Sequence, residues 1–72
     1  MNNARRKEIA NVIKEIEKTI SDILSDEMES YDNMPDGIKE SQNGYNSEAA
    51  QDSLDSAIDS LEEAIQYLEE IE

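Results

Sequence analysis

The feature that most constrains the fold is the spacing of apolar residues in the C-terminal part of the chain. From about residue 47 to residue 71, apolar residues recur at alternating steps of four and three. This spacing places them on one face of an α-helix as a heptad seam. Since leucine occupies one of the two alternating positions and mostly small alanine the other, a partner helix can approach closely. The seam consists of Ala50, Leu54, Ala57, Leu61, Ala64, Leu68 and Ile71, and Ile58 and Ile65 widen it on one side.

A second helical pattern precedes it and runs from about residue 4 to residue 31. Its large apolar residues also recur at steps of three and four, and no glycine or proline interrupts them. Asn2 or Asn3 is the expected N-cap of this helix, and Asn46 or Ser47 is the expected N-cap of the second helix. The pattern of the first helix consists of Ile9, Val12, Ile13, Ile16, Ile20, Ile23, Leu24, Met28 and Tyr31.

Fifteen residues, 32–46, connect the two patterns and contain two turn signals, Pro35-Asp36-Gly37 and Asn43-Gly44. Pro35 can also open a short helical turn over residues 35–41. Two long helices joined by one connection usually fold back on each other. We therefore expect an all-α protein with a single domain over residues 1–72, an antiparallel hairpin of helices at about 4–31 and 47–71.

The charge distribution favours the same antiparallel geometry. The 72 residues carry 19 acidic and 6 basic side chains, a net charge of -13, and five of the basic residues lie within the first eighteen positions. Folding back brings this basic end beside the acidic C-terminus, where exposed ion pairs select the orientation. The expected neighbours are Arg5, Arg6 and Lys7 with Glu69, Glu70 and Glu72, and Lys14 and Lys18 with Glu62 and Glu63. The expected apolar register pairs Ile9 with Ile71, Ile13 with Leu68, Ile20 with Leu61, and Met28 with Leu54.

Two helices cannot cover both of their own apolar stripes. One core in a chain below about 70–80 residues rarely supplies more than about 3–5 kcal/mol, so small proteins often gain stability by association. We therefore expect a homo-oligomer, dimer or higher, in which hairpins form a helical bundle. Val12, Leu24, Ile58 and Ile65 are the candidate interface residues, and a lone hairpin with frayed ends is the alternative.

The residue types that are missing exclude several classes of function. The chain has no His and no Cys. Zinc, haem and iron–sulfur sites therefore lack their usual ligands, and Ser–His or Cys–His catalytic pairs are excluded. A calcium-binding EF-hand starting at Asp32 fails at Met34, where Asp or Asn is needed, and at Asn43, where Glu is needed. We expect a protein that is not an enzyme and that uses no cofactor and no metal.

The charge and hydropathy also limit the partners. A net charge of -13 opposes direct nucleic-acid binding. No apolar run of about 18 residues is present, so no membrane span is expected. The basic N-terminus lacks the apolar segment of a signal peptide. These features predict a cytoplasmic protein.

The strongest candidate for a binding surface is acidic. After Lys18 the chain carries 16 acidic residues and one basic residue, Lys39. Helical spacing places many of these acids on one outer face of the second helix, where they resemble the spaced charges of a DNA backbone. Such a face suits a basic partner, for instance the DNA groove of an enzyme, although a solvated face that only maintains solubility is the alternative. The predicted contact residues are Asp52, Asp55, Asp59, Glu62 and Glu63, and the second choice is the connecting loop with Tyr31, Asn33, Pro35, Asp36 and Tyr45.

The run Tyr31–Ile38, "YDNMPDGI", is followed by an acidic helix that includes Leu61–Ile65. This arrangement resembles small acidic proteins of bacteriophages and prophages of Gram-positive bacteria. The resemblance implies a phage accessory protein in the cytoplasm of a bacterial host, where very small acidic proteins often inhibit host enzymes or host defence. It transfers no functional residues to this chain.

Two alternatives to an acidic inhibitor remain. The first is an oligomeric sponge that sequesters a small signalling nucleotide between hairpins. Its anion-binding residues would be Arg5, Arg6 and Lys7, together with free helix N-termini. The second is a purely structural helical bundle that binds no ligand.

Overall fold

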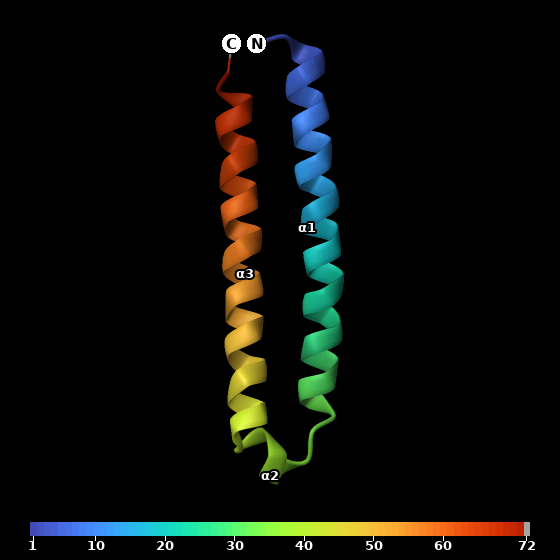
Figure 1. Ribbon diagram of the computed structural model, residues 1–72, viewed down its shortest axis with the longest axis vertical. Coiled ribbons are helices and arrows are strands. Elements are labelled where there is room, and N and C mark those ends of the chain that lie inside the picture. Colours follow the sequence, from blue (N-terminus) through green and yellow to red (C-terminus); the bar gives the residue numbers. More distant parts are fainter. Residues whose placement is uncertain (72) are drawn as a thin grey trace.

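The computed structural model describes residues 1–71, and the only regular secondary structure in that range is helical. Helix α1 spans Asn3–Asp32, the short helix α2 spans Asp36–Lys39, and helix α3 spans Gln42–Glu69. The two long helices lie side by side in opposite directions, and α2 lies at the end where they are joined (Figure 1). The molecule is a rod with extents of 54 × 15 × 11 Å. The predicted pairing of two long helices is confirmed.

Helix α1 begins and ends close to its predicted limits. The side-chain oxygen of Asn2 accepts a hydrogen bond of 2.8 Å from the backbone N–H of Arg5, which is the expected N-cap. At the other end, the backbone N–H of Asn33 donates to the carbonyl of Glu29 at 3.0 Å. Thirty residues are therefore helical without interruption, as the absence of glycine and proline predicts.

Helix α3 begins five residues earlier than predicted, because most of the expected loop is helical. Ser41, and not Asn46 or Ser47, precedes its first residue. The Ser41 hydroxyl donates back to the carbonyl of Ile38 in α2, so it does not cap α3. The predicted short helical turn is present as α2. The loop of residues 32–46 shrinks to Asn33–Pro35 and a two-residue step between α2 and α3.

Gly44, which was predicted to lie in a turn, lies inside α3, where the space beside its Cα is occupied by the backbone of Lys39. A Cβ atom at this position would lie 1.9 Å from the carbonyl oxygen of Lys39 and 2.4 Å from its carbonyl carbon. The glycine therefore permits a close backbone approach between α3 and α2. In contrast, a Cβ atom on Gly37 would meet nothing within 4 Å.

The face of α1 that packs against α3 differs from the predicted one. Its half-buried positions again follow steps of three and four, but they include two glutamates. Ile9, Ile16, Ile23 and Met28, which the apolar pattern placed on the packed face, are 40–52% exposed, and so is Val12, which was predicted as an interface residue. Helix α1 is apolar over two neighbouring faces, and one partner helix can cover only one of them. The packed positions of α1 are Arg6, Ala10, Ile13, Glu17, Ile20, Leu24, Glu27 and Tyr31.

Two of the four predicted apolar pairs are wrong. Ile9 and Met28 were expected to face Ile71 and Leu54, but both are exposed. Instead, the Arg6 guanidinium donates to the backbone carbonyl of Ile71. The members of the other two predicted pairs, Ile13 with Leu68 and Ile20 with Leu61, are all half-buried. The expected neighbour Glu72 lies outside the described residues.

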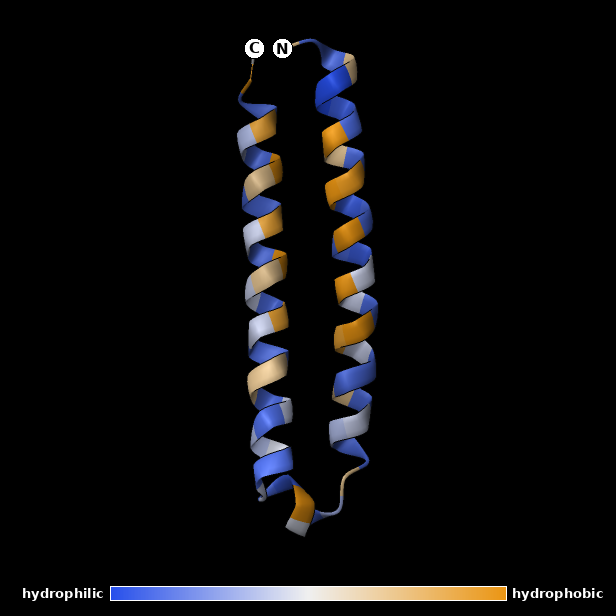
Figure 2. Ribbon diagram, viewed as in Figure 1, coloured by the Kyte–Doolittle hydropathy of each residue, from blue (hydrophilic) through white to orange (hydrophobic). Residues whose placement is uncertain are grey.

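Polar groups interrupt the α1–α3 contact. Ser47 is 4% exposed, and its hydroxyl donates to the carboxylate of Glu27 at 2.6 Å. Gln51 donates to the same hydroxyl at 3.4 Å. One carboxylate oxygen of Glu17 is buried without a hydrogen-bond partner, an arrangement that costs stability. The contact is therefore only partly apolar. Figure 2 shows that hydrophilic and hydrophobic residues alternate along both long helices.

The hairpin has little core. Within residues 1–71 no hydrophobic side chain is fully buried. In the same range no helix is both long enough and apolar enough to cross a membrane.

We predict that Gly44→Ala destabilises the protein, because its methyl group would collide with the backbone of Lys39. Overpacking of this kind typically costs about 1–3 kcal/mol, and thermal or urea unfolding followed by circular dichroism measures it. The matched control is Gly37→Ala in α2, where a Cβ atom meets nothing. Alanine there should leave stability unchanged or raise it by up to about 1 kcal/mol. Equal effects of the two substitutions would contradict the close approach of α2 and α3.

Candidate functional site

The predicted acidic contact residues all lie on α3 and are all exposed. They follow one another at steps of three, four, three and one, so they occupy one side of the helix. The leucines that pack toward α1 lie on another side, because Leu54 and Leu61 are half-buried. Helix α3 contains no Lys or Arg anywhere along Gln42–Glu69. We call Asp52, Asp55, Asp59, Glu62 and Glu63 the acidic face.

The second predicted surface is not a loop. Asn33, Pro35 and Asp36 are exposed at the turn, and Asp36 begins α2. Tyr45 lies within α3, where it is 56% exposed. Tyr31 is half-buried at the end of α1. The five residues therefore come from three helices and one short connection, and Tyr31 has a structural contact of its own.

Tyr31 joins the three helices at the turn. Its hydroxyl donates a hydrogen bond to a carboxylate oxygen of Glu48 in α3. The ammonium group of Lys39 in α2 lies 5.2 Å from the centre of the Tyr31 ring, within the range of a cation–π interaction. The hydrogen bond to the Glu48 carboxylate raises the pKa of Tyr31, because ionisation would remove the donated proton beside a negative charge. Tyr31 therefore closes the turn end of the helix pair. Tyr67, near the other end, is 63% exposed.

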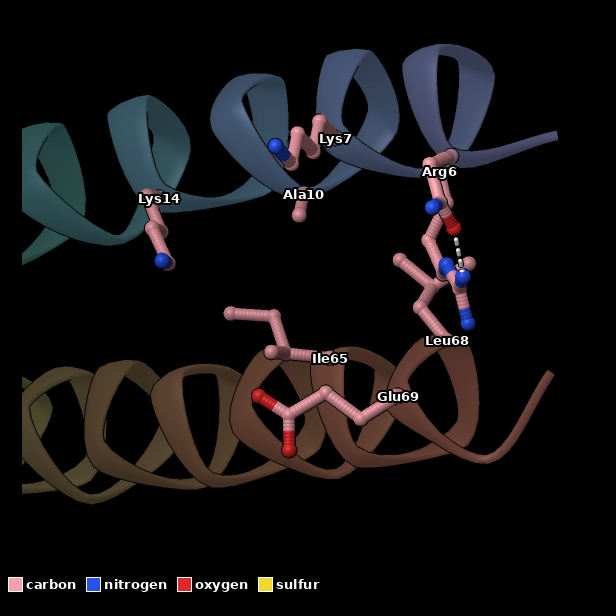
Figure 3. Close-up of a pocket in the computed structure, with 8 residues that line it drawn as sticks. Arg6, Lys7, Ala10, Lys14, Ile65, Leu68 and Glu69 are labelled. Atoms are coloured by element: carbon pink, nitrogen blue, oxygen red, sulfur yellow. Dashed lines mark hydrogen bonds between the residues drawn. The ribbon is translucent and has the colours of Figure 1, made fainter. Parts of the chain in front are cut away.

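A groove of about 380 Å³ lies between α1 and α3 near the chain termini. Figure 3 shows basic side chains of α1 on one side of it and apolar side chains of α3 on the other. The Arg6 guanidinium is held in place by the Ile71 carbonyl and by the side-chain oxygen of Asn3. We call this hollow the basic groove, and it is lined by Asn3, Arg6, Lys7, Ala10, Lys14, Ile65, Leu68 and Glu69.

The basic groove includes two of the three predicted anion-binding residues, Arg6 and Lys7, and excludes Arg5. It adds Lys14, for which only an ion pair was expected. A signal for Lys14 was present in the sequence, because Lys7 and Lys14 are one heptad apart and therefore share a side of the helix. Cationic groups around an apolar floor suit an anion that also has an apolar part, although Glu69 opposes a negative ligand.

Within the described residues, no group of three or more Asp or Glu side chains is arranged to hold a metal ion. No protein-family model, curated protein or solved structure matches this chain.

We predict that Tyr31→Phe lowers the melting temperature at neutral pH, because the substitution removes the hydrogen bond to Glu48. The pKa of Tyr31 in the folded protein is raised above the usual value of 10.0. The bond therefore stabilises the fold fully below about pH 10 and is lost as the pH rises through the folded pKa. The difference in melting temperature between the native protein and Tyr31→Phe should shrink above that pH. Tyr67→Phe, at an exposed position, is the control and should change neither value.

Proposed function

We propose that this chain is a non-catalytic binding protein that docks its acidic face on a basic protein partner. The observation that supports this function most directly is the acidic face itself. Its five carboxylates are exposed on a single uninterrupted helix of 28 residues that contains no basic side chain. A helix of this length holds the charges at fixed spacing, which favours fast, electrostatically steered association with a complementary surface.

The resemblance of residues 31–38 to phage proteins suggests what the partner is. A phage protein of this kind would bind a basic protein of its bacterial host and inhibit it. Mimicry of DNA is one form of such inhibition, since a row of carboxylates can occupy a groove that otherwise receives phosphates. The supporting fact is the uniform sign of charge along α3.

We predict that neutralising the acidic face abolishes capture of the basic partner from bacterial lysate. The test variant carries Asp52→Asn, Asp55→Asn, Asp59→Asn, Glu62→Gln and Glu63→Gln, and mass spectrometry identifies what each bait retains. The native protein should release its partner at about 1 M salt, where the Debye length falls to ~3 Å. Capture that survives this salt unchanged would contradict an electrostatic contact.

A matched control removes the same charge from the other long helix. Glu8, Glu15, Asp22, Asp26 and Glu29 are exposed on α1, and their conversion to the corresponding amides gives the same net charge as the test variant. This control should retain the partner. If both variants lose it equally, net charge and not the acidic face is responsible.

The basic groove favours a second candidate function, which is the sequestration of a small phosphate-bearing ligand such as a signalling nucleotide. The supporting observation is the convergence of Arg6, Lys7 and Lys14 on one hollow of about 380 Å³ with an apolar floor. This volume is at the lower end of the range of small-molecule sites, about 300–1,000 Å³.

We predict that a ligand of this class raises the melting temperature of the native protein in a panel of cyclic and linear nucleotides with inorganic phosphate as reference. The double substitution Lys7→Gln and Lys14→Gln should remove the shift. Arg5→Gln and Lys18→Gln remove the same charge outside the groove and should preserve it. A flat response of the native protein across the panel would exclude this second function.

We also propose that hairpins associate into a helical bundle. The described chain exposes 5394 Å², whereas a folded monomer of 8.2 kDa exposes about 4,500 Å². The larger exposed area indicates that the single hairpin buries too little surface. The absence of any fully buried hydrophobic side chain in residues 1–71 also indicates this. A chain of this size gains the missing burial most directly from another copy of itself.

A further inference from the structure

Helix α1 carries an exposed apolar stripe that the hairpin leaves uncovered. Ile9, Val12, Ile16 and Ile23 are 40%, 52%, 44% and 52% exposed, at steps of three, four and seven. Thr19 fills the one gap in this spacing. Its hydroxyl donates to the backbone carbonyl of Glu15 at 3.1 Å, so its polar group is already satisfied. The stripe is therefore continuous over about two heptads, the length of a helix–helix seam.

Helix α3 carries a stripe of small, uncharged residues, Ser53, Ala57, Ser60 and Ala64, at steps of four, three and four. The alanines are half-buried and the serines are exposed. No member of the acidic face belongs to this stripe.

Both stripes lie on the same side of the hairpin, opposite the basic groove. On α1, Ile9 and Ile16 follow the groove residues Lys7 and Lys14 by two positions, which is roughly 200° around the helix. On α3, the leucines face α1. Ile65 lies on the groove side of these leucines. Ala64 is about 100° from Ile65 around the helix and lies on the other side of the leucines. We call the combined surface the apolar face.

We infer that the apolar face is the site at which a second copy of this chain docks, with α1 of each copy lying across α3 of the other. This inference rests on the proposed association of hairpins and specifies its geometry. The two-fold axis runs parallel to the helices, so the chain termini of both copies lie at one end of a four-helix bundle and both turns lie at the other.

The sizes of the side chains favour this arrangement. The α1 stripe consists mainly of large, branched side chains, and the α3 stripe consists of alanine and serine. Large side chains of one copy can therefore enter the space above the small side chains of the other. A hollow of about 280 Å³ already lies on the α1 stripe, lined by Val12, Glu15, Ile16, Thr19 and Ile20, and can receive a side chain as a hole receives a knob.

The net charges of the helix halves favour the same orientation. Residues 1–18 carry five basic and three acidic side chains, and with α1 antiparallel to α3 of the other copy they lie at the same end as the acidic C-terminal half of that α3. This attraction acts between the helix halves and not through contacts in the interface, because Lys7 and Lys14 line the groove on the opposite side. The alternative two-fold axis, perpendicular to the helices, would place the two α3 helices against each other. Each α3 has acidic side chains and no basic one, so that packing juxtaposes like charges.

The exposed area is large enough for such an interface. The surface exceeds the value expected for a compact monomer of this mass by about 900 Å², and each partner in a standard stable interface needs to bury about 800 Å². The basic groove and the acidic face stay outside this interface.

The first experiment is sedimentation equilibrium of the native protein and of Ile16→Lys, which puts a charge at the centre of the apolar face. The native protein should be a dimer, and Ile16→Lys should raise its dissociation constant at least about tenfold, since an apolar contact is lost in both copies. Met28→Lys is the control, because Met28 is equally exposed on α1, at 47%, but lies off the apolar face. A native monomer at tens of micromolar, or equal weakening by both variants, overturns the inference.

The second experiment measures the orientation without disturbing the interface. The chain has no cysteine, and a side chain at Gly37 meets nothing within 4 Å, so Gly37→Cys accepts a single spin label at the turn. Double electron–electron resonance should give a label separation within roughly 30 Å, because neighbouring helices lie about 8–10 Å apart. A separation near the 54 Å length of the hairpin places the turns at opposite ends. That result overturns this geometry while leaving the association of hairpins and the acidic function standing.

Discussion

Two helices that pack only on each other can each cover a single face, and this limit shapes the whole molecule. Helix α1 is apolar over two neighbouring faces, so one of them stays in water whichever way the hairpin closes. The contact that does form is diluted by Glu17, Glu27 and Ser47. The weak core and the exposed stripe of α1 thus have one origin, and the proposed dimer would cover the stripe.

In the proposed dimer, the apolar, basic and acidic surfaces of each hairpin lie on different sides. Apolar and small residues occupy the side that meets the second copy, the basic groove lies on the opposite side, and the acidic face lies on the outside of α3. A two-fold dimer displays two acidic faces. If both reach the same basic partner, or neighbouring copies of it, the second contact forms at a high effective concentration and the complex persists longer than either contact alone.

The sequence predicted the elements well because helix formation depends on local spacing. Residues 4–31 follow a clear apolar period, and α1 was placed within one residue at each end. The errors came from contacts between distant residues. Gly44 looks like a turn residue in the sequence, and only the approach of Lys39 shows why glycine is needed inside α3. Likewise, periodicity alone could not tell which of the two apolar faces of α1 meets α3. The exposure of the acidic face was predicted correctly, because a row of carboxylates must stay in water. The role of Lys14 in the groove could not be predicted, because it depends on where Ile65 of the other helix lies.

The cluster at the turn has a consequence for how the chain folds. Tyr31, Lys39, Gly44 and Glu48 meet across separations of no more than seventeen residues, so closing this end costs little chain entropy. The helices can then zip toward the termini, where Arg6 and Ile71 are sixty-five residues apart. Each step of this pathway joins residues that the preceding contacts already hold close together, and folding through such local contacts is fast. The open end of the rod, which holds the basic groove, therefore closes last and frays first.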